Sequence, residues 1–153
     1  MESKAISESI KDSVYAVRRV SDTIMSVRME TKEGCWTTIS VCAPQTGCPE
    51  KGKDEFYLTL DDVIRSVPDD GFLTIAGDLN GHVGTDRTGD RLERVHGGRG
   101  VGAKNEEGER ILDLAVSHDL AICSTFFAKR ESQKMTYCSG GLRTEVDHIL
   151  VRR

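Results

Sequence analysis

The sequence predicts a mixed α/β fold, in which a sheet of parallel and antiparallel strands packs against helices. Short runs with alternating apolar residues, typical of strands, lie on both sides of two segments whose apolar residues recur with the helical period. The strands and helices do not alternate strictly, as they would in a doubly wound parallel sheet. We therefore expect a mixed-sheet sandwich of the α/β (α+β) class.

Length and composition fit one domain, since 37% of the 153 residues are hydrophobic and 30% are charged. Residues 1–12 are expected to form a polar N-terminal lead-in without the apolar core of a signal peptide, and residues 13–153 the domain. No apolar run approaches the roughly 20 residues that cross a bilayer. Five cysteines without a Cys-x-x-Cys pair favour reduced thiols over disulfides or structural zinc. We expect an intracellular protein, nuclear or cytoplasmic and not secreted.

Three strands are predicted at the start of the domain. Residues 14–20 and 23–30 alternate in polarity around Ser21 and Asp22, which indicates a hairpin with a two-residue connection. Residues 36–43 continue the alternation as a third strand, which ends at Pro44.

Two helices are predicted from one-sided apolar spacing. The first starts at Asp54, ends before Pro68 and buries Phe56, Leu60, Val63, Ile64 and Val67. The second is capped by Asn105, runs to about Asp119 and buries Ile111, Leu112 and Ala115.

The remaining segments are predicted as strands and one long loop. Residues 72–76 form an apolar run typical of a strand buried on both faces, and residues 120–124, 134–138 and 144–151 are expected to form further strands. Residues 81–104 hold seven glycines and are too long for a simple connector. This loop carries Arg87, Arg91, Arg94 and Arg99, which could meet a phosphate backbone, but its acidic residues make a solvated loop an equal alternative.

Asp78 and Asn80 are the strongest chemical signal. They stand two residues apart after a strand, so a carboxylate and an amide can point into one site. Phosphodiester cleavage needs a base or metal to activate water, and donors or cations to stabilise charge on phosphate oxygens. On spacing alone, a surface turn explains Asp-Leu-Asn-Gly better, because turns favour these residues.

Several motifs resemble the endonuclease/exonuclease/phosphatase superfamily. Residues 77–84, Gly-Asp-Leu-Asn-Gly-His-Val-Gly, are similar to its Gly-Asp-Phe-Asn motif, in the extended form of LINE-type retrotransposon endonucleases and craniofacial development protein 2-like sequences. Residues 136–140, together with residues 144–151 (Thr-Glu-Val-Asp-His-Ile-Leu-Val), resemble its Thr-aromatic segment and Ile-Asp-His/Tyr-Ile-Leu strand. Residues 20–25 and 105–114 match less specifically, but all four blocks occur in the family's order.

The resemblance implies roles for three catalytic residues. Asp78 would orient or deprotonate the attacking water, Asn80 would contact the phosphate or support the metal site, and Asp147 would orient a catalytic histidine supplied later in the chain. It also implies Mg²⁺ or Mn²⁺, with Asp78 and Asn80 as metal contacts, and nicking of DNA as the ancestral reaction. Without this context, Asp147 and His148 would be read as a polar pair at the solvent edge of a strand.

The sequence also departs from the family pattern. Cys42 stands where relatives have a phosphate-contacting tyrosine, and we expect it to be structural. The family's metal-binding Glu and an Asn precede the position of Val14, and its terminal Ser-Asp-His would follow Arg153. We therefore expect a partial domain, incomplete at both ends, that is weakly active or inactive in isolation.

Two other functions remain open for the sequence. A non-catalytic remnant or binding domain would explain the missing catalytic positions, and a small-molecule phosphoesterase would use the same motif. A net charge of −4 also counts against tight, non-specific binding of DNA.

Overall fold

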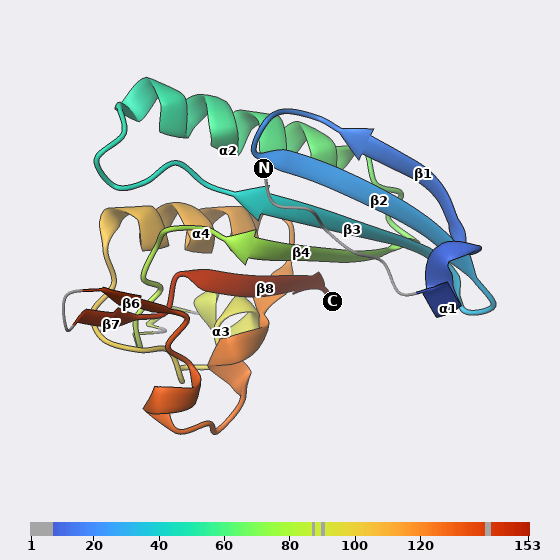
Figure 1. Ribbon diagram of the computed structural model, residues 1–153. Helices are drawn as coiled ribbons and strands as arrows, with labels where there is room; N and C mark the ends of the chain where they lie inside the picture. The colour runs from blue at the N-terminus through green and yellow to red at the C-terminus, as the bar shows by residue number, and fades with distance from the viewer. Residues whose placement is uncertain (1–7, 87, 90, 140–141) are drawn as a thin grey trace.

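The computed structural model describes residues 8–86, 88–89, 91–139 and 142–153, which form a mixed sheet and a small hairpin (Figure 1). The six-stranded sheet has the order β1-β2-β3-β4-β8-β5; β3 and β4 are parallel, and the other neighbours are antiparallel. Its strands are β1 (Val14–Arg19), β2 (Ile24–Thr31), β3 (Gly34–Cys42), β4 (Phe72–Asp78), β5 (Leu120–Ile122) and β8 (Asp147–Arg152). The two-stranded sheet pairs β6 (Tyr137–Ser139) with β7 (Leu142–Thr144). The predicted mixed sheet is confirmed.

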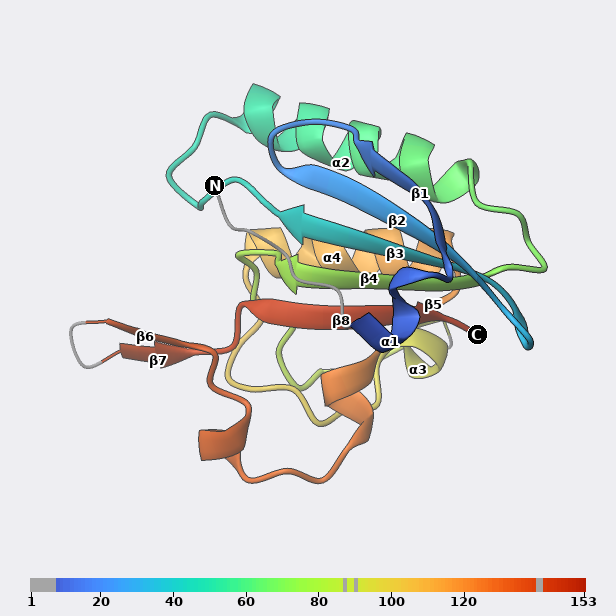
Figure 2. The same ribbon diagram turned by 45° about the vertical axis from the view of Figure 1, so that its right-hand side comes forward.

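Two long helices, α2 (Glu50–Arg65) and α4 (Glu106–Ser117), lie side by side on one face of the sheet (Figure 2). The shorter helices are α1 (Glu8–Lys11) and α3 (Leu92–Val95), and two 3₁₀ turns span Cys123–Phe126 and Glu131–Gln133. Both predicted long helices are present. The first begins four residues earlier than Asp54, because Pro49 has a φ of −58° and can stand directly before a helix without a backbone donor.

The hydrophobic core lies between these helices and the sheet. Ile39, Ile75 and Leu150 stand in register on three neighbouring strands, and none of them is exposed to solvent. The helices cover them with the apolar side chains that the spacing predicted, namely Phe56, Leu60, Val63 and Ile64 of α2 and Ile111, Leu112 and Ala115 of α4. The core therefore fixes the register of β3, β4 and β8.

The opposite face of the sheet, here called the open face, is not covered by α2 or α4. Large apolar side chains on it remain exposed, namely Tyr15, Val17, Phe72 and Ile149. In β4, Thr74 and Ala76 are only half-buried, while Leu73 and Ile75 on the helix side are buried. The prediction that residues 72–76 are buried on both faces is therefore wrong, because both long helices pack on the same side.

The C-terminal strands differ from the predicted ones. The expected strand at residues 134–138 starts only at Tyr137, and residues 144–151 are divided between β7 and β8. The long loop contains α3. Gly140, Arg87 and the first seven residues of the expected lead-in lie outside the described residues. In the part of the chain that the structure describes, we find no helix with the length and apolarity needed to span a membrane.

Candidate active site

The structure brings Asp78 and Asp147 together at one end of the sheet. Asp78, the last residue of β4, is the direct cross-strand partner of Asp147, the first residue of β8. Side chains of directly opposed residues lie on the same face, with Cβ atoms roughly 5 Å apart. That face is the open face, and this end of β4 and β8 lies beside the β6–β7 hairpin (Figure 1).

Asn80 is held in the turn that follows β4. Its backbone N–H donates to Asp78 Oδ1 at 2.9 Å, and its side-chain Nδ2 donates to the carbonyl of Ala43 at 2.7 Å. Its φ of 51° is a left-handed conformation that asparagine tolerates better than most residues. The motif therefore forms the turn that its composition predicts, and that turn places Asn80 beside the paired carboxylates.

Gly77 allows β3 and β4 to approach closely before this turn. It has a φ of 144°, and a Cβ at this position would lie 2.0 Å from the carbonyl oxygen of Val41. A side chain at this position would push the two strands apart, so the motif requires a glycine here for steric reasons.

His148 contacts the motif from the helix side of β8, opposite to the face on which Asp147 lies. It is buried, and its Nε2 donates to the carbonyl of Gly81 at 2.8 Å, which requires the proton on Nε2. Asp147 is exposed and points the other way. The two residues are therefore not a polar pair at a solvent edge, because β8 lies between β4 and β5 in the sheet.

Asn105 ties the motif to the start of α4. Its Oδ1 accepts hydrogen bonds from the N–H groups of His82 and Gly108, at 2.9 and 2.8 Å, and its own N–H donates to the carbonyl of His82. The sequence predicted only the helix cap, because the contact with His82 spans 23 residues.

Thr136 organises the start of β8. Its Oγ1 accepts hydrogen bonds from the backbone N–H groups of Val146 and Asp147, both at 3.1 Å. The Thr-aromatic segment of the sequence therefore positions the Asp147 backbone. Its place in the motif was the signal for this role.

The paired carboxylates are not part of a closed metal site. Within the described residues, no group of three or more His, Cys, Asp or Glu side chains is arranged to hold an ion. Cys42 is the direct partner of Asp78 on β3, and its side chain is exposed. Like charges directly opposite each other on neighbouring strands repel, so the two carboxylates place negative charge at this end of the sheet.

A basic groove lies between the loop that follows the Asp78 motif and the segment that precedes Thr136. Its lining contains four cationic residues and no acidic one: Arg99, Lys129, Arg130 and Lys134. Lys134 is buried and donates to the carbonyl of Arg99, and exposed Phe127 also lines the groove. Its volume is about 570 Å³.

The basic groove is lined by residues close to both motifs. A Cβ on Gly100 would lie 1.7 Å from the carbonyl oxygen of Gly84, at the end of the motif, and Lys134 stands two residues before Thr136. Of the loop arginines named from sequence, Arg99 lines the groove, whereas Arg94 pairs with Asp119 at 2.8 Å.

Comparisons with known proteins agree with this architecture. The fold is similar to that of an endonuclease/exonuclease/phosphatase family protein from Leptotrichia buccalis C-1013-b, with a TM-score of 0.51 and 14% identity over 85% of this chain and 41% of that one. This chain has the endonuclease/exonuclease/phosphatase fold. The mixed sheet expected from the sequence resemblance is thereby confirmed.

Two sequence relatives extend the comparison. The chain is 27% identical over 150 residues to craniofacial development protein 2 of Tragulus javanicus and of Bos taurus, which covers 97% of this chain. The chain spans about a quarter of the length of these curated relatives, since the match covers 25% of each. No family model matches. The similarity to craniofacial development protein 2 that the motifs indicated is confirmed.

Proposed function

We propose that this chain carries a phosphodiester-hydrolysing site of the endonuclease type, formed by Asp78, Asn80 and Asp147. The observation that supports it most is the direct pairing of Asp78 with Asp147 at one end of the sheet. The two carboxylates are 69 residues apart in sequence, and each lies in one of the two motifs that the sequence analysis singled out. A purely structural turn at residues 78–81 would need no second carboxylate opposite it.

The chemistry proposed for these side chains follows from their contacts. The Asn80 N–H donates to Asp78 Oδ1 and holds this carboxylate in place, and a carboxylate that lies at such a site can accept a hydrogen bond from a water molecule and orient it. Asn80 uses Nδ2 to bind Ala43, which fixes the amide and leaves its second N–H for a phosphate oxygen. Asp147 supplies the second negative charge of the pair.

We propose Mg²⁺ or Mn²⁺ as the cation of this site. Mg²⁺ is commonly bound by one or two carboxylates together with waters and substrate phosphates, which matches the pair of Asp78 and Asp147. When bound, such an ion supplies positive charge against the phosphate oxygens. Asn80, named from sequence as a metal contact, supports the ion through the turn that it forms with Asp78.

DNA is the substrate that we propose, and the basic groove is where its backbone would lie. Four cations line this groove without an acid, so it attracts phosphates although the net charge of the chain is −4. Phe127 is 58% exposed and offers a flat apolar surface for a base or sugar. The extended motif through Gly84 favours a nuclease over an enzyme for small phosphoesters.

The expected activity of the 153-residue chain is low. Losing one preorganised group from such a site commonly lowers the rate by about two to three powers of ten. Among the described residues, the His148 side chain points away from Asp78 and Asp147, and no third possible metal ligand lies close to these two carboxylates. A non-catalytic domain that binds nucleic acid through the basic groove is therefore the second candidate.

Nicking of supercoiled plasmid in the presence of Mg²⁺ or Mn²⁺ tests the proposal. We expect slow nicking that disappears in Asp78→Ala and Asp147→Ala. The control Asp113→Asn removes an exposed carboxylate of α4 and should nick like the wild type. Hydrolysis of p-nitrophenyl phosphate without nicking would indicate a small-molecule phosphoesterase. DNA binding without hydrolysis, lost in Arg130→Glu, would support the non-catalytic candidate.

Origin and location are part of the same proposal. The extended motif suggests descent from a LINE-type retrotransposon, and reverse-transcriptase sequence beside the coding region would support it. Four of the five cysteines are exposed, so a reducing compartment, the nucleus or cytoplasm, suits the chain. Fractionation of cells that express the tagged chain checks this location.

A further inference from the structure

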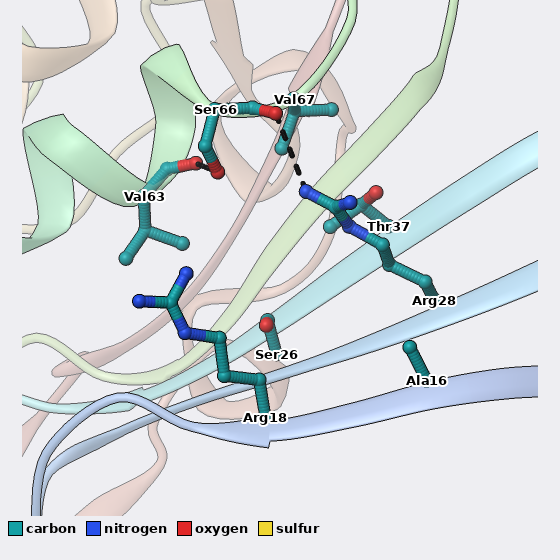
Figure 3. Close-up of a pocket in the computed structure, with 8 residues that line it drawn as sticks. All are labelled: Ala16, Arg18, Ser26, Arg28, Thr37, Val63, Ser66 and Val67. Carbon is teal, nitrogen blue, oxygen red and sulfur yellow. Dashed lines mark hydrogen bonds between the residues drawn. The ribbon is translucent and has the colours of Figure 1, made fainter.

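A small pocket lies between the last turn of α2 and strands β1–β3, on the helix side of the sheet (Figure 3). It is separate from the carboxylate pair, which lies on the open face. The volume of the pocket is about 110 Å³. Since roughly 15 Å³ suffices to hold one water molecule, there is room for a phosphate-sized anion.

Two guanidinium groups converge on this pocket, and no acidic residue lines it. Arg18 of β1 extends toward Val63 of α2, while Arg28 of β2 donates from Nη2 to the carbonyl of Ser66 at 3.3 Å (Figure 3). Within the described residues, the Arg18 side chain makes no hydrogen bond or ion pair, and the Arg28 side chain makes only the hydrogen bond to Ser66. Most of the N–H donors of both side chains are therefore available to a ligand.

Two hydroxyl groups complete the polar lining. Ser26 and Thr37 are 7% and 5% exposed, and neither makes a side-chain hydrogen bond in the part of the chain that the structure describes. Ser26 is the direct partner of Arg18 across β1 and β2. Their oxygens are not among the buried side-chain atoms that lack a partner, so both hydroxyls are accessible from the pocket and can donate to a ligand there.

We propose that this pocket binds a tetrahedral oxyanion, a phosphate or a phosphoryl group, between Arg18 and Arg28. Planar guanidinium groups match the oxygens of a phosphate, and the hydroxyls of Ser26 and Thr37 donate to the remaining oxygens. The carbonyls at the C-terminus of α2 carry partial negative charge, which repels an anion. Two of them already accept hydrogen bonds, Val63 O from Ser66 Oγ and Ser66 O from Arg28, which reduces this repulsion.

The competing explanation is that Arg28 only caps the C-terminus of α2 and that Arg18 is a solvated side chain. Titration with inorganic phosphate, O-phosphoserine and chloride at constant ionic strength separates the two, with melting temperature and amide chemical shifts as readouts. We expect saturable binding of the phosphorylated ligands and shifts at the amides of residues 26 and 37. Tighter binding of O-phosphoserine would assign the pocket to a phosphoester, and tighter binding of inorganic phosphate to the free anion.

Two matched variants locate the binding. Arg18→Gln should weaken phosphate binding about tenfold or more, since hydrogen bonds to charged groups are strong, and should leave the melting temperature in phosphate-free buffer unchanged. Arg19→Gln, on the opposite face of β1 and paired only with exposed Asp22, should bind like the wild type. Unchanged phosphate affinity in Arg18→Gln, or no effect of phosphate beyond that of chloride, would overturn the proposal.

Discussion

Asp78 and Asp147 illustrate how one residue pair can limit stability and support function at the same time. They stand directly opposite each other, where two negative charges repel, and a hydrogen bond from Asn80 reaches only the first of them. Asp147 is exposed, so water reduces this repulsion without removing it. A cation between the carboxylates would turn the repulsion into attraction.

This arrangement predicts that Asp147→Asn stabilises the chain in the absence of divalent ions. Removing one charge should raise the free energy of unfolding by about 0.2–1 kcal/mol, measured by urea denaturation in EDTA. Mg²⁺ should raise the melting temperature of the wild type but not of the variant. A variant that is less stable in EDTA would show that the carboxylates do not repel each other.

The sequence indicated that Asp78 and Asp147 lie together but did not indicate the contacts that hold them, and the catalytic roles of these residues stay a prediction. The proximity of Asp78 to Asp147 could be expected, because each motif is visible in the sequence. The bond from His148 to Gly81 spans 67 residues, and that from Asn105 to His82 spans 23. Such contacts follow from how strands and helices pack, which local patterns do not encode.

At the level of elements, glycines determine how closely α4 approaches the motif. A Cβ on Gly108 would lie 1.8 Å from the carbonyl oxygen of His82, whereas one on Gly52, near the start of α2, would contact nothing within 4 Å. Both glycines are helical, so the same substitution has opposite expected effects.

We expect Gly52→Ala to stabilise the chain by about 0.5–1 kcal/mol, because alanine restricts the unfolded chain and favours helix. Gly108→Ala should destabilise it by about 1–3 kcal/mol, because the contact with His82 must open. Urea denaturation measures both. Equal effects of the two substitutions would contradict the close approach of α4 to the motif.

A buried ion pair connects the two long helices. Lys53 of α2 donates to Glu107 of α4 at 2.8 Å, and also to Glu50 at 2.8 Å. The hydrogen bond from Lys53 holds the pKa of the Glu107 carboxyl below its ordinary value of 4.5. Because the folded chain binds this proton less readily than the unfolded one, the contribution is present above pH 4.5 and is lost as the pH falls below it.

The pH dependence of unfolding checks the Lys53–Glu107 pair. Glu107→Gln should lower the melting temperature by several degrees at neutral pH, and the difference from the wild type should shrink as the pH falls below 4.5. Glu55→Gln, an exposed carboxylate of α2, serves as the control and should change little. A difference that grows on acidification would exclude the assigned role of Glu107.

Element prediction was accurate where periodicity carried the information. The predicted hairpin and both long helices appear, although the connection of the hairpin spans residues 20–23 and not only the two predicted residues, Ser21 and Asp22. The break between β7 and β8 was missed, because residues 144–151 are continuously compatible with a strand. At the break, the backbone N–H groups of Val146 and Asp147 donate to Thr136 Oγ1. Thr136 lies 10 and 11 residues before them in the sequence, so no local pattern indicates this contact.

For the whole molecule, the one-sided placement of helices is the property that sequence could not supply. An apolar run indicates burial but does not say which face is covered. Strand β4 therefore looked buried on both sides, although Phe72 is 44% exposed. Tyr15 and Val17 of the edge strand β1 are also exposed, and exposed apolar side chains at a sheet edge favour self-association.

We predict that Val17→Lys reduces self-association without loss of stability. Val17 is 60% exposed on the edge strand β1, and a charge at a strand edge opposes pairing with another chain. Light scattering against protein concentration measures the effect. Val17→Thr, which keeps the branched shape without the charge, should be intermediate. Equal scattering from all three proteins would rule out this surface as the cause.

Strand β8 occupies a central place in the sheet, although it is the last described strand in sequence. Until residues 147–152 have emerged from the ribosome, β4 and β5 lack the neighbour that joins them, and Asp147 cannot pair with Asp78. Strands β1 to β4 can pair earlier during synthesis. The core around β8 and the carboxylate pair are thus expected to form together, once β8 has been synthesised and can insert between β4 and β5.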